Sequence, residues 1–315
     1  ALFGPTDASK LLVLVSGTHG VEGFAGSGAQ ISMIESLRFA ALPARTAVVV
    51  IHAINPYGFA WLRRVNEDNV DLNRNAVDFD RLPPPNAEFL ALAPDLVPRD
   101  WADLAPAESR IRAFIDANGF RRFQEVVGGG QYTHPDGLFY GGSAPVWSAR
   151  TFREIVARYG RGKQRIAVID IHTGLGPLGY GEPIYTGDDQ EEAARASEWY
   201  GPDLTAIYAG NSASVIVQGP MINAVTSFFA AAAAKPEITT MALEFGTLPA
   251  EIVFDALRAE AWMHAQGDIN FDTPVGRALK RRFRDAFYVD VDAWKRAVVD
   301  RAVEMTGHAL AGLAG

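Results

Sequence analysis

The side chains best suited to metal chemistry include a His and a Glu in one short, glycine-rich motif. The motif SGTHGVEG spans residues 16–23 and places His19 and Glu22 three positions apart. In a turn that leads into a helix, this spacing directs both side chains to the same side. Imidazole nitrogen and carboxylate oxygen both bind zinc, so the pair predicts part of a metal site. The alternative interpretation is a glycine-rich turn whose His and Glu are merely exposed.

Two further candidates lie in apolar runs that are typical of buried strands. The run RIAVIDIHTGLG, residues 165–176, places His172 at the end of such a strand, and MALEFGT, residues 241–247, places Glu244 inside another. A single His in this position is more often a structural residue. Glu244 is more informative, because an unpaired buried carboxylate is costly and needs either a partner or a function.

Taken together, these residues predict a catalytic metal site. Two His and one Glu leave one zinc position for water, and a second Glu can take the proton from that water. We therefore predict one Zn²⁺ per chain, held by His19, Glu22 and His172, with Glu244 as general base. Other divalent ions also accept this ligand set, so the native metal stays open.

A polar run with several Arg and Asn residues follows the second apolar run of the chain. The stretch RRVNEDNVDLNRN covers residues 63–75. The planar guanidinium group of Arg recognises carboxylates through two parallel hydrogen bonds. The run is consistent with a carboxylate-binding site, and its alternative interpretation is a solvated charged loop.

The elements that position these residues alternate between strands and helices. Short apolar runs predict strands, and apolar residues at three- and four-residue steps predict helices between them. The expected strands are Leu11–Ser16, Thr46–Ile54, Arg165–Ile171, Ala213–Gln218 and Thr239–Phe245. The expected helices are Phe24–Phe39, Ala107–Asn118, Ala149–Tyr159, Asp189–Tyr200, Glu251–Gln266 and Val291–Thr306. This order predicts an α/β fold with a mixed, mostly parallel central sheet and helices on both faces.

One segment departs from the alternating pattern. Residues 76–148 contain the proline cluster at residues 83–85, three successive glycines at 128–130 and the stretch GQYTHPDGLFYGG at 130–142. We interpret this segment as an insertion into a single domain that spans residues 1–315. Loops longer than about 12–15 residues are often lids or binding loops, so the insertion is a candidate part of the active site.

Composition excludes several classes of protein. The 315 residues include no Cys, 48% are hydrophobic and the formal net charge is −8. Disulfides and thiolate metal sites are therefore excluded, and a generally basic nucleic-acid-binding surface is disfavoured. No apolar run approaches the roughly 20 residues of a membrane span. We expect a cytoplasmic protein without nucleic-acid or membrane partners, and the sequence leaves a homo-oligomer open.

The order of the motifs resembles the zinc carboxypeptidase superfamily. The order is His-x-x-Glu, then DLNRN at residues 71–75, then Asp-x-His at a strand end and a late Glu in a strand, and the resemblance runs from Leu11 to Thr247. The stretch at 130–142 resembles a bacterial branch known mainly as a domain of unknown function. The resemblance implies a zinc carboxypeptidase-like fold and the metal ligands and base given above.

The resemblance also implies roles for the polar run. Asp71 matches the acid that orients the first His, and Asn73 and Arg74 match the pair that binds the terminal carboxylate of the substrate. Arg64 matches the arginine that stabilises the oxyanion, with Arg63 as the competing choice. The chain departs from the family in residues 221–229, which contain no Tyr where carboxypeptidases usually have one that contacts the substrate.

These observations lead to a ranked set of functions. The first is a zinc-dependent hydrolase that cleaves an amide or peptide bond next to a free carboxylate, on a small-molecule or peptide substrate. The second is an N-acyl amino acid deacylase, resembling the aspartoacylase-like branch, which the missing Tyr and the insertion favour. The third is a metal- or carboxylate-binding module without catalysis, although such a module would not need Glu244.

Overall fold

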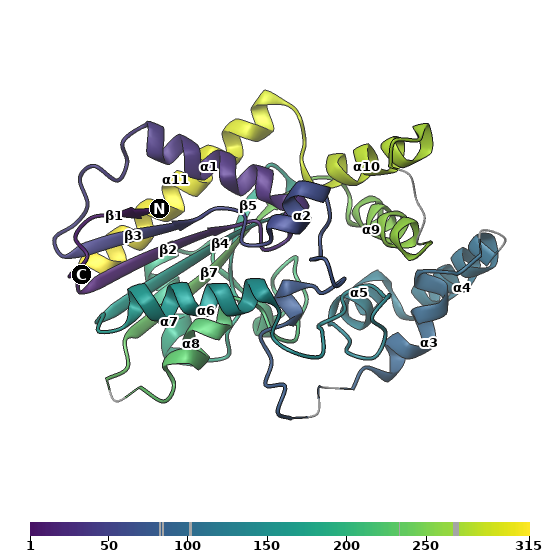
Figure 1. Ribbon diagram of the computed structural model, residues 1–315, viewed down its shortest axis with the longest axis horizontal. Coiled ribbons are helices and arrows are strands. Elements are labelled where there is room, and N and C mark those ends of the chain that lie inside the picture. The colour runs from purple at the N-terminus through teal and green to yellow at the C-terminus, as the bar shows by residue number, and fades with distance from the viewer. Residues whose placement is uncertain (82, 84, 101–102, 233, 267–270) are drawn as a thin grey trace.

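A seven-stranded mixed sheet lies at the centre of the protein (Figure 1). The computed structural model describes residues 1–81, 83, 85–100, 103–232, 234–266 and 271–315. The strands are β1 (Leu2–Phe3), β2 (Lys10–Ser16), β3 (Thr46–Ile51), β4 (Arg165–Leu178), β5 (Gly181–Tyr185), β6 (Thr205–Ala206) and β7 (Glu237–Gly246), in the order β1-β3-β2-β4-β7-β5-β6.

The strands that carry the predicted metal site are the parallel ones. Strands β3, β2, β4 and β7 all run in the same direction, whereas β1 and β5 are antiparallel to their neighbours β3 and β7. Parallel neighbours end at the same edge of a sheet, and ligands bind outside those carboxyl ends in open α/β sheets. His172 in β4 is directly opposite Glu244 in β7, so two predicted site residues meet at this edge.

Helices cover both faces of the sheet, which explains why its strands are apolar on both sides. One face packs against α1 (Gly23–Glu35), α7 (Gln190–Tyr200) and α11 (Asp292–Ala314), and the other against α6 (Trp147–Gly160) and α8 (Asn223–Phe229). Figure 1 shows α1 and α11 on one side of the sheet and α6 and α8 on the other. The predicted fold class is confirmed. Among the described residues, no helix is both long and apolar enough to cross a membrane.

A third apolar cluster lies beyond the carboxyl edge of the sheet. It joins helices from residues 87–128 to two helices near the C-terminus (Figure 1). The first group comprises α3 (Ala87–Leu96), α4 (Leu104–Asn118) and α5 (Phe120–Gly128), and the second α9 (Ala250–Ala265) and α10 (Pro274–Phe287). The rings of Phe123 in α5 and Phe254 in α9 meet edge to face, with centroids 4.8 Å apart. The helices of the predicted insertion therefore pack on a core of their own with α9 and α10.

Most predicted elements are present, but one predicted strand is wrong. Residues 213–218 form an irregular loop, although their composition favours a strand. The carbonyl groups of Ser212, Ala213 and Ser214 accept hydrogen bonds from Arg121 instead of from a neighbouring strand. Beyond β7 the sheet continues instead with β5 and the two-residue edge strand β6, which the sequence analysis did not identify.

Several short elements were also missed, among them α2 (Pro56–Trp61) and the 3₁₀ helices η1 (Gly20–Glu22), η2 (Leu72–Arg74) and η4 (Ile207–Ala209). The helices α3, α5, α8 and α10 were not predicted either. The predicted insertion at 76–148 contains α3 to α5, and Pro84 of its proline cluster lies outside the described residues. The single-domain assignment stays a prediction.

A buried ionic cluster joins α9 and α10 to Arg63, the first residue of the polar run. Glu260 in α9 accepts a hydrogen bond of 2.9 Å from Arg63 and one of 2.9 Å from Lys280, and His264 lies 3.0 Å away. Burial alone would raise the pKa of Glu260, but His264, Arg63 and Lys280 outweigh it and lower that pKa to about 2. The cluster stabilises the folded state as long as Glu260 is ionised.

Truncation of Phe89 tests the third cluster. Phe89 in α3 is fully buried, at 0% exposure, so Phe89→Ala is expected to lower the free energy of unfolding by about 3 to 5 kcal/mol. The neighbouring Leu90 is 42% exposed, and Leu90→Ala should cost less than about 1 kcal/mol. Urea unfolding measures both. Equal losses in the two variants would show that α3 is not packed as described.

A pH series tests the ionic cluster. The depressed pKa of Glu260 corresponds to about 3 kcal/mol of stability at pH 7, which is lost as the pH falls from about 4.5 to 2. Glu260→Gln lacks this contribution, so its deficit relative to the wild type should be largest at pH 7 and shrink across that window. Urea unfolding between pH 7 and pH 2 measures the deficit, with the exposed Glu251→Gln on the same helix as control. A deficit that does not change with pH would contradict the assignment.

Candidate metal centre

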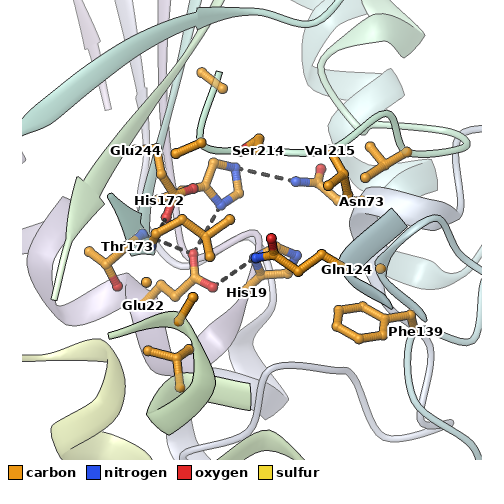
Figure 2. A pocket seen from close by; sticks show the side chains of 18 of the residues that line it. His19, Glu22, Asn73, Gln124, Phe139, His172, Thr173, Ser214, Val215 and Glu244 are labelled. Atoms are coloured by element: carbon orange, nitrogen blue, oxygen red, sulfur yellow. Dashed lines mark hydrogen bonds and ion pairs between the residues drawn. The ribbon is translucent and has the colours of Figure 1, made fainter. Parts of the chain in front are cut away.

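The structure brings the three predicted ligands together at the carboxyl edge of the sheet. His19, Glu22 and His172 are buried, and one potential ligand atom from each lies within 4.8 Å of the others. The Glu22 carboxylate lies between the two rings, with Oε1 2.9 Å from Nδ1 of His19 and Oε2 3.0 Å from Nδ1 of His172. Figure 2 shows this arrangement, with both imidazoles directed toward one carboxylate.

Close backbone contacts hold the loop that carries His19 and Glu22. The backbone N–H groups of Gly20 and Val21 donate to the carbonyl groups of Arg64 and Arg63, at 3.3 and 2.9 Å. A Cβ atom on Gly20 would lie 1.9 Å from the carbonyl carbon of Gly58 in α2, so only glycine permits this approach. The glycine-rich composition of the motif therefore has a direct structural cause.

A second carboxylate holds each imidazole from its other side. Nε2 of His19 lies 3.1 Å from Asp71 Oδ1, and Nε2 of His172 lies 2.9 Å from Asp170 Oδ2. Such contacts fix the tautomer and the orientation of metal-binding imidazoles, and they leave Nδ1 for the metal. Asp71 thus contacts His19, and its role toward a metal ligand stays a prediction. The sequence analysis assigned no role to Asp170, although the Asp-x-His spacing was the signal that could have identified it.

The electrostatics of this group favour a positive charge between its members. Burial alone would raise the pKa of the Glu22 carboxyl, but His19 and His172 outweigh it and hold that pKa well below its usual value. Burial also opposes protonation of His172, yet Asp170 and Glu22 outweigh it and raise its pKa well above the ordinary value. Two imidazole nitrogens and a carboxylate form a suitable donor set for a divalent transition metal.

Glu244 lies beside this group and not within it. Its Oε1 accepts a hydrogen bond of 3.0 Å from the backbone N–H of Leu175. Burial, together with the nearby negative charge of Glu22, raises the pKa of Glu244 to about 8. A carboxyl group with a pKa near neutrality can both accept and donate a proton at physiological pH.

Arg64 joins the metal group to its surroundings. Its Nε donates to Asp71 at 2.9 Å, and its Nη1 donates to Glu22 at 3.1 Å. Both carboxylates partly neutralise this guanidinium. Arg64 also stacks on the ring of Phe139, with its Cζ 5.2 Å from the ring centroid. The backbone φ of Phe139 is +53°, a conformation that is uncommon for a bulky side chain and that often marks functional sites.

Asn73 and Arg74 line the same cavity. Nδ2 of Asn73 lies 3.4 Å from Nε2 of His172, and Oδ1 of Asn73 accepts a hydrogen bond of 3.0 Å from the backbone N–H of Met221. Arg74 donates to two backbone carbonyl groups, those of Gly128 and Asn73. The nearest carboxylate in an ion pair with it is Asp71, at 3.9 Å. Burial lowers the pKa of Arg74 to about 10.

Arg63 points elsewhere. Its guanidinium bonds to Glu260 and Asn69 in the ionic cluster described above, and it is not among the residues that line the cavity. Of the two adjacent arginines that the resemblance left in competition, the structure therefore places only Arg64 beside the metal group.

The metal group lines a cavity of about 160 Å³. Much of the remaining wall is apolar and comes from α5, α9, β5 and the loop after η4. The sequence analysis did not identify the wall residues Phe120, Gln124, Phe139, Val215, Val217, Val253, Phe254 and Leu257. Apart from Gln124, their side-chain types are ordinary for a protein core, so only their position around the cavity distinguishes them.

Comparison with solved structures finds distant likenesses. Succinylglutamate desuccinylase from Chromobacterium violaceum is 15% identical over 91% of this chain, with a TM-score of 0.38, and this chain spans about 64% of its length. Murein-tripeptide amidase MpaA from Escherichia coli O157 is 16% identical over 84% of each chain, with a TM-score of 0.36. Bovine thrombin-activatable fibrinolysis inhibitor is 10% identical over 94% of this chain and 83% of its own, with a TM-score of 0.40.

Comparison of the sequence is more decisive. No curated protein matches it significantly. A family model matches residues 1–301, a range that includes every residue of the metal group and the cavity wall. The resemblance to a bacterial branch of unknown function is thereby confirmed, and the chain belongs to the family described as Protein of unknown function (DUF2817).

Proposed function

We propose that this protein is a zinc-dependent hydrolase that cleaves an amide bond next to a free carboxylate. The observation that carries the proposal is the convergence of His19, Glu22 and His172 beside Glu244 in a cavity that also contains Arg74. Zinc bound by the three ligands would polarise the scissile carbonyl and lower the pKa of the attacking water. The other steps depend on side chains of the chain itself.

Glu244 is the proposed general base. Its partly buried carboxyl lies beside the ligand cluster without belonging to it, and its raised pKa suits proton transfer near neutrality. It accepts the proton of the attacking water and then passes it to the leaving amine. Arg64 stabilises the negative charge that develops on the carbonyl oxygen, because its remaining N–H groups border the same cavity.

Arg74 is the proposed anchor for the substrate carboxylate. Arg64 is compensated by two carboxylates, whereas the hydrogen-bond partners of Arg74 are the neutral carbonyl groups of Gly128 and Asn73. Its five N–H groups are not exhausted by these bonds. Asp71, at 3.9 Å, is too distant for a hydrogen bond, so a substrate carboxylate would be the first carboxylate to hydrogen-bond Arg74, and Asn73 provides a neighbouring polar group in the cavity wall.

An N-acyl amino acid deacylase is the second candidate. Residues 221–229 contain no Tyr, which removes a side chain expected of a C-terminal peptidase. A panel of C-terminally free peptides and N-acyl amino acids separates the two activities. Zinc-loaded protein that binds small carboxylates but hydrolyses neither class would instead favour a binding module.

Substitution of the base tests the hydrolase proposal directly. Purified wild-type protein should contain about one zinc per chain by metal analysis. Glu244→Gln preserves shape but cannot take a proton, so it should retain the metal and lose about 10²- to 10⁴-fold in kcat. His172→Ala should lose the metal as well. Wild-type turnover in Glu244→Gln would contradict the assignment of the base, and metal-free wild-type protein would contradict the metal site.

Substitution of Arg74 tests the carboxylate anchor. Arg74→Gln should lower the ratio of kcat/KM for a free-carboxylate substrate to that for its primary amide by about 10- to 100-fold, because a charge-assisted hydrogen bond is lost. Arg63→Lys is the matched control, since Arg63 points to Glu260 and a cation is retained there. An unchanged ratio in Arg74→Gln, or an equal fall in the control, would refute the anchor.

A further inference from the structure

Helices α5 and α9 each present one face to the cavity that the metal group lines. Phe120, Gln124 and Gly128 of α5 all line the cavity and are spaced four residues apart. From α9 the lining residues are Ala250, Val253, Phe254 and Leu257. These intervals place each set on one face of its helix. The cavity therefore has a wall built from two helical stripes, which we call the α5–α9 wall.

The α5–α9 wall faces the cavity as well as the core. Val253 and Leu257 are buried, but Phe120, Phe254 and Ala250 are only partly buried. The edge-to-face contact of Phe123 with Phe254 closes the wall from behind. A wall of this kind presents apolar surface to whatever enters the cavity, and covering that surface is favourable.

The position of α5 relates this wall to the proposed carboxylate anchor. The carbonyl group of Gly128, at the end of α5, accepts two hydrogen bonds from Arg74. From Gly128 the lining face runs back along the helix to Phe120, a distance of about 12 Å at 1.5 Å per residue. A substrate held at Arg74 can therefore extend along this face for the length of several bonds.

The acyl part of a substrate bound in this way would lie on the Glu244 side of the metal group. In Figure 2, Asn73 and Glu244 lie on opposite sides of His172. With the carboxylate on the Asn73 side, the acyl part of the substrate extends past Glu244. Helix α9 begins six residues after Glu244 in sequence. Phe287 also lines the cavity, and both its ring and the Glu244 carboxyl lie close to Gly174: a Cβ atom on that glycine would be 3.0 Å from the ring and 3.8 Å from Oε1.

One polar side chain interrupts the apolar surface. Gln124 is partly buried and lines the cavity, and its side-chain amide makes no hydrogen bond to any residue that the structure describes. In Figure 2 the side chain of Gln124 extends toward the metal group, where its end overlaps His19 in the view. A primary amide has both a donor and an acceptor to offer, so it suits an amide group of the substrate.

From these features we infer that the α5–α9 wall is a subsite for an apolar acyl group, joined by its amide to the carboxylate-bearing part of the substrate. The inference rests on the proposed function for the position of the carboxylate and the scissile bond. It adds the substrate class: N-acyl compounds whose acyl chain is longer than acetyl are preferred, and Gln124 hydrogen-bonds an amide of the bound substrate.

An acyl-chain series tests the subsite. The probes are N-acetyl-, N-butyryl- and N-hexanoylglycine, which differ only in chain length. Because each buried methylene contributes about fourfold in affinity, kcat/KM of the zinc-loaded enzyme should rise by about tenfold or more from one probe to the next. A flat or falling series would overturn the subsite while leaving the hydrolase proposal intact.

A blocking variant locates the effect. Ala250→Leu narrows the cavity at the α5–α9 wall and should reduce the hexanoyl-to-acetyl ratio of kcat/KM by tenfold or more. Ile252→Leu, two residues away on α9, alters a side chain that is 45% exposed and does not line the cavity, so its ratio should match the wild type. A ratio that is unchanged in Ala250→Leu would place the chain-length effect elsewhere and overturn the inference.

Binding without turnover separates this inference from the proposed function. Calorimetry with Glu244→Gln protein measures the affinity for the same three compounds when no reaction takes place. Affinity that rises with chain length, with no hydrolysis by the wild type, would uphold the subsite and overturn the hydrolase. Gln124→Leu should lower the affinity for all three probes by a similar factor, and an unchanged affinity would overturn the role given to Gln124.

Discussion

The carboxylate of Glu22 between two imidazoles is the contact on which the rest of the site depends. Each imidazole is held from behind by its own aspartate, Asp71 for His19 and Asp170 for His172. Because these groups are buried, an excess of negative charge would be costly unless a positive charge lies among them. The same requirement explains why Arg64 packs against this group and why the protein is suited to hold a cation there.

The two halves of the site come from different parts of the fold. The parallel strands of the sheet bring His172 and Glu244 to one edge, where the loop with His19 meets them. The cavity wall comes from α5 and α9, which pack in a separate apolar cluster beyond that edge. The sheet thus positions His172 and Glu244, while helices outside the sheet shape the cavity.

The ionic cluster around Glu260 ties these halves together. Arg63 and Arg64 are adjacent in sequence, yet one bonds to α9 and the other to the metal group. The loop that carries them also pairs with the backbone of Gly20 and Val21. The adjacent residues Arg63 and Arg64 therefore connect α9 to the loop that carries His19 and Glu22. Arg63 thus has a structural contact in the ionic cluster, whereas Arg64 lies beside the proposed reaction.

The sequence by itself indicated the candidate ligands and the candidate base. His172 and Glu244 stand out in otherwise apolar strands, and His19 and Glu22 share one glycine-rich motif. It also predicted most of the long elements. It failed at residues 213–218, whose strand-like composition serves a cavity wall instead. Only the tertiary structure decided which arginine faces the metal group and that Gln124 and Phe254 border the cavity. These depend on which distant segments meet, and local composition does not record that.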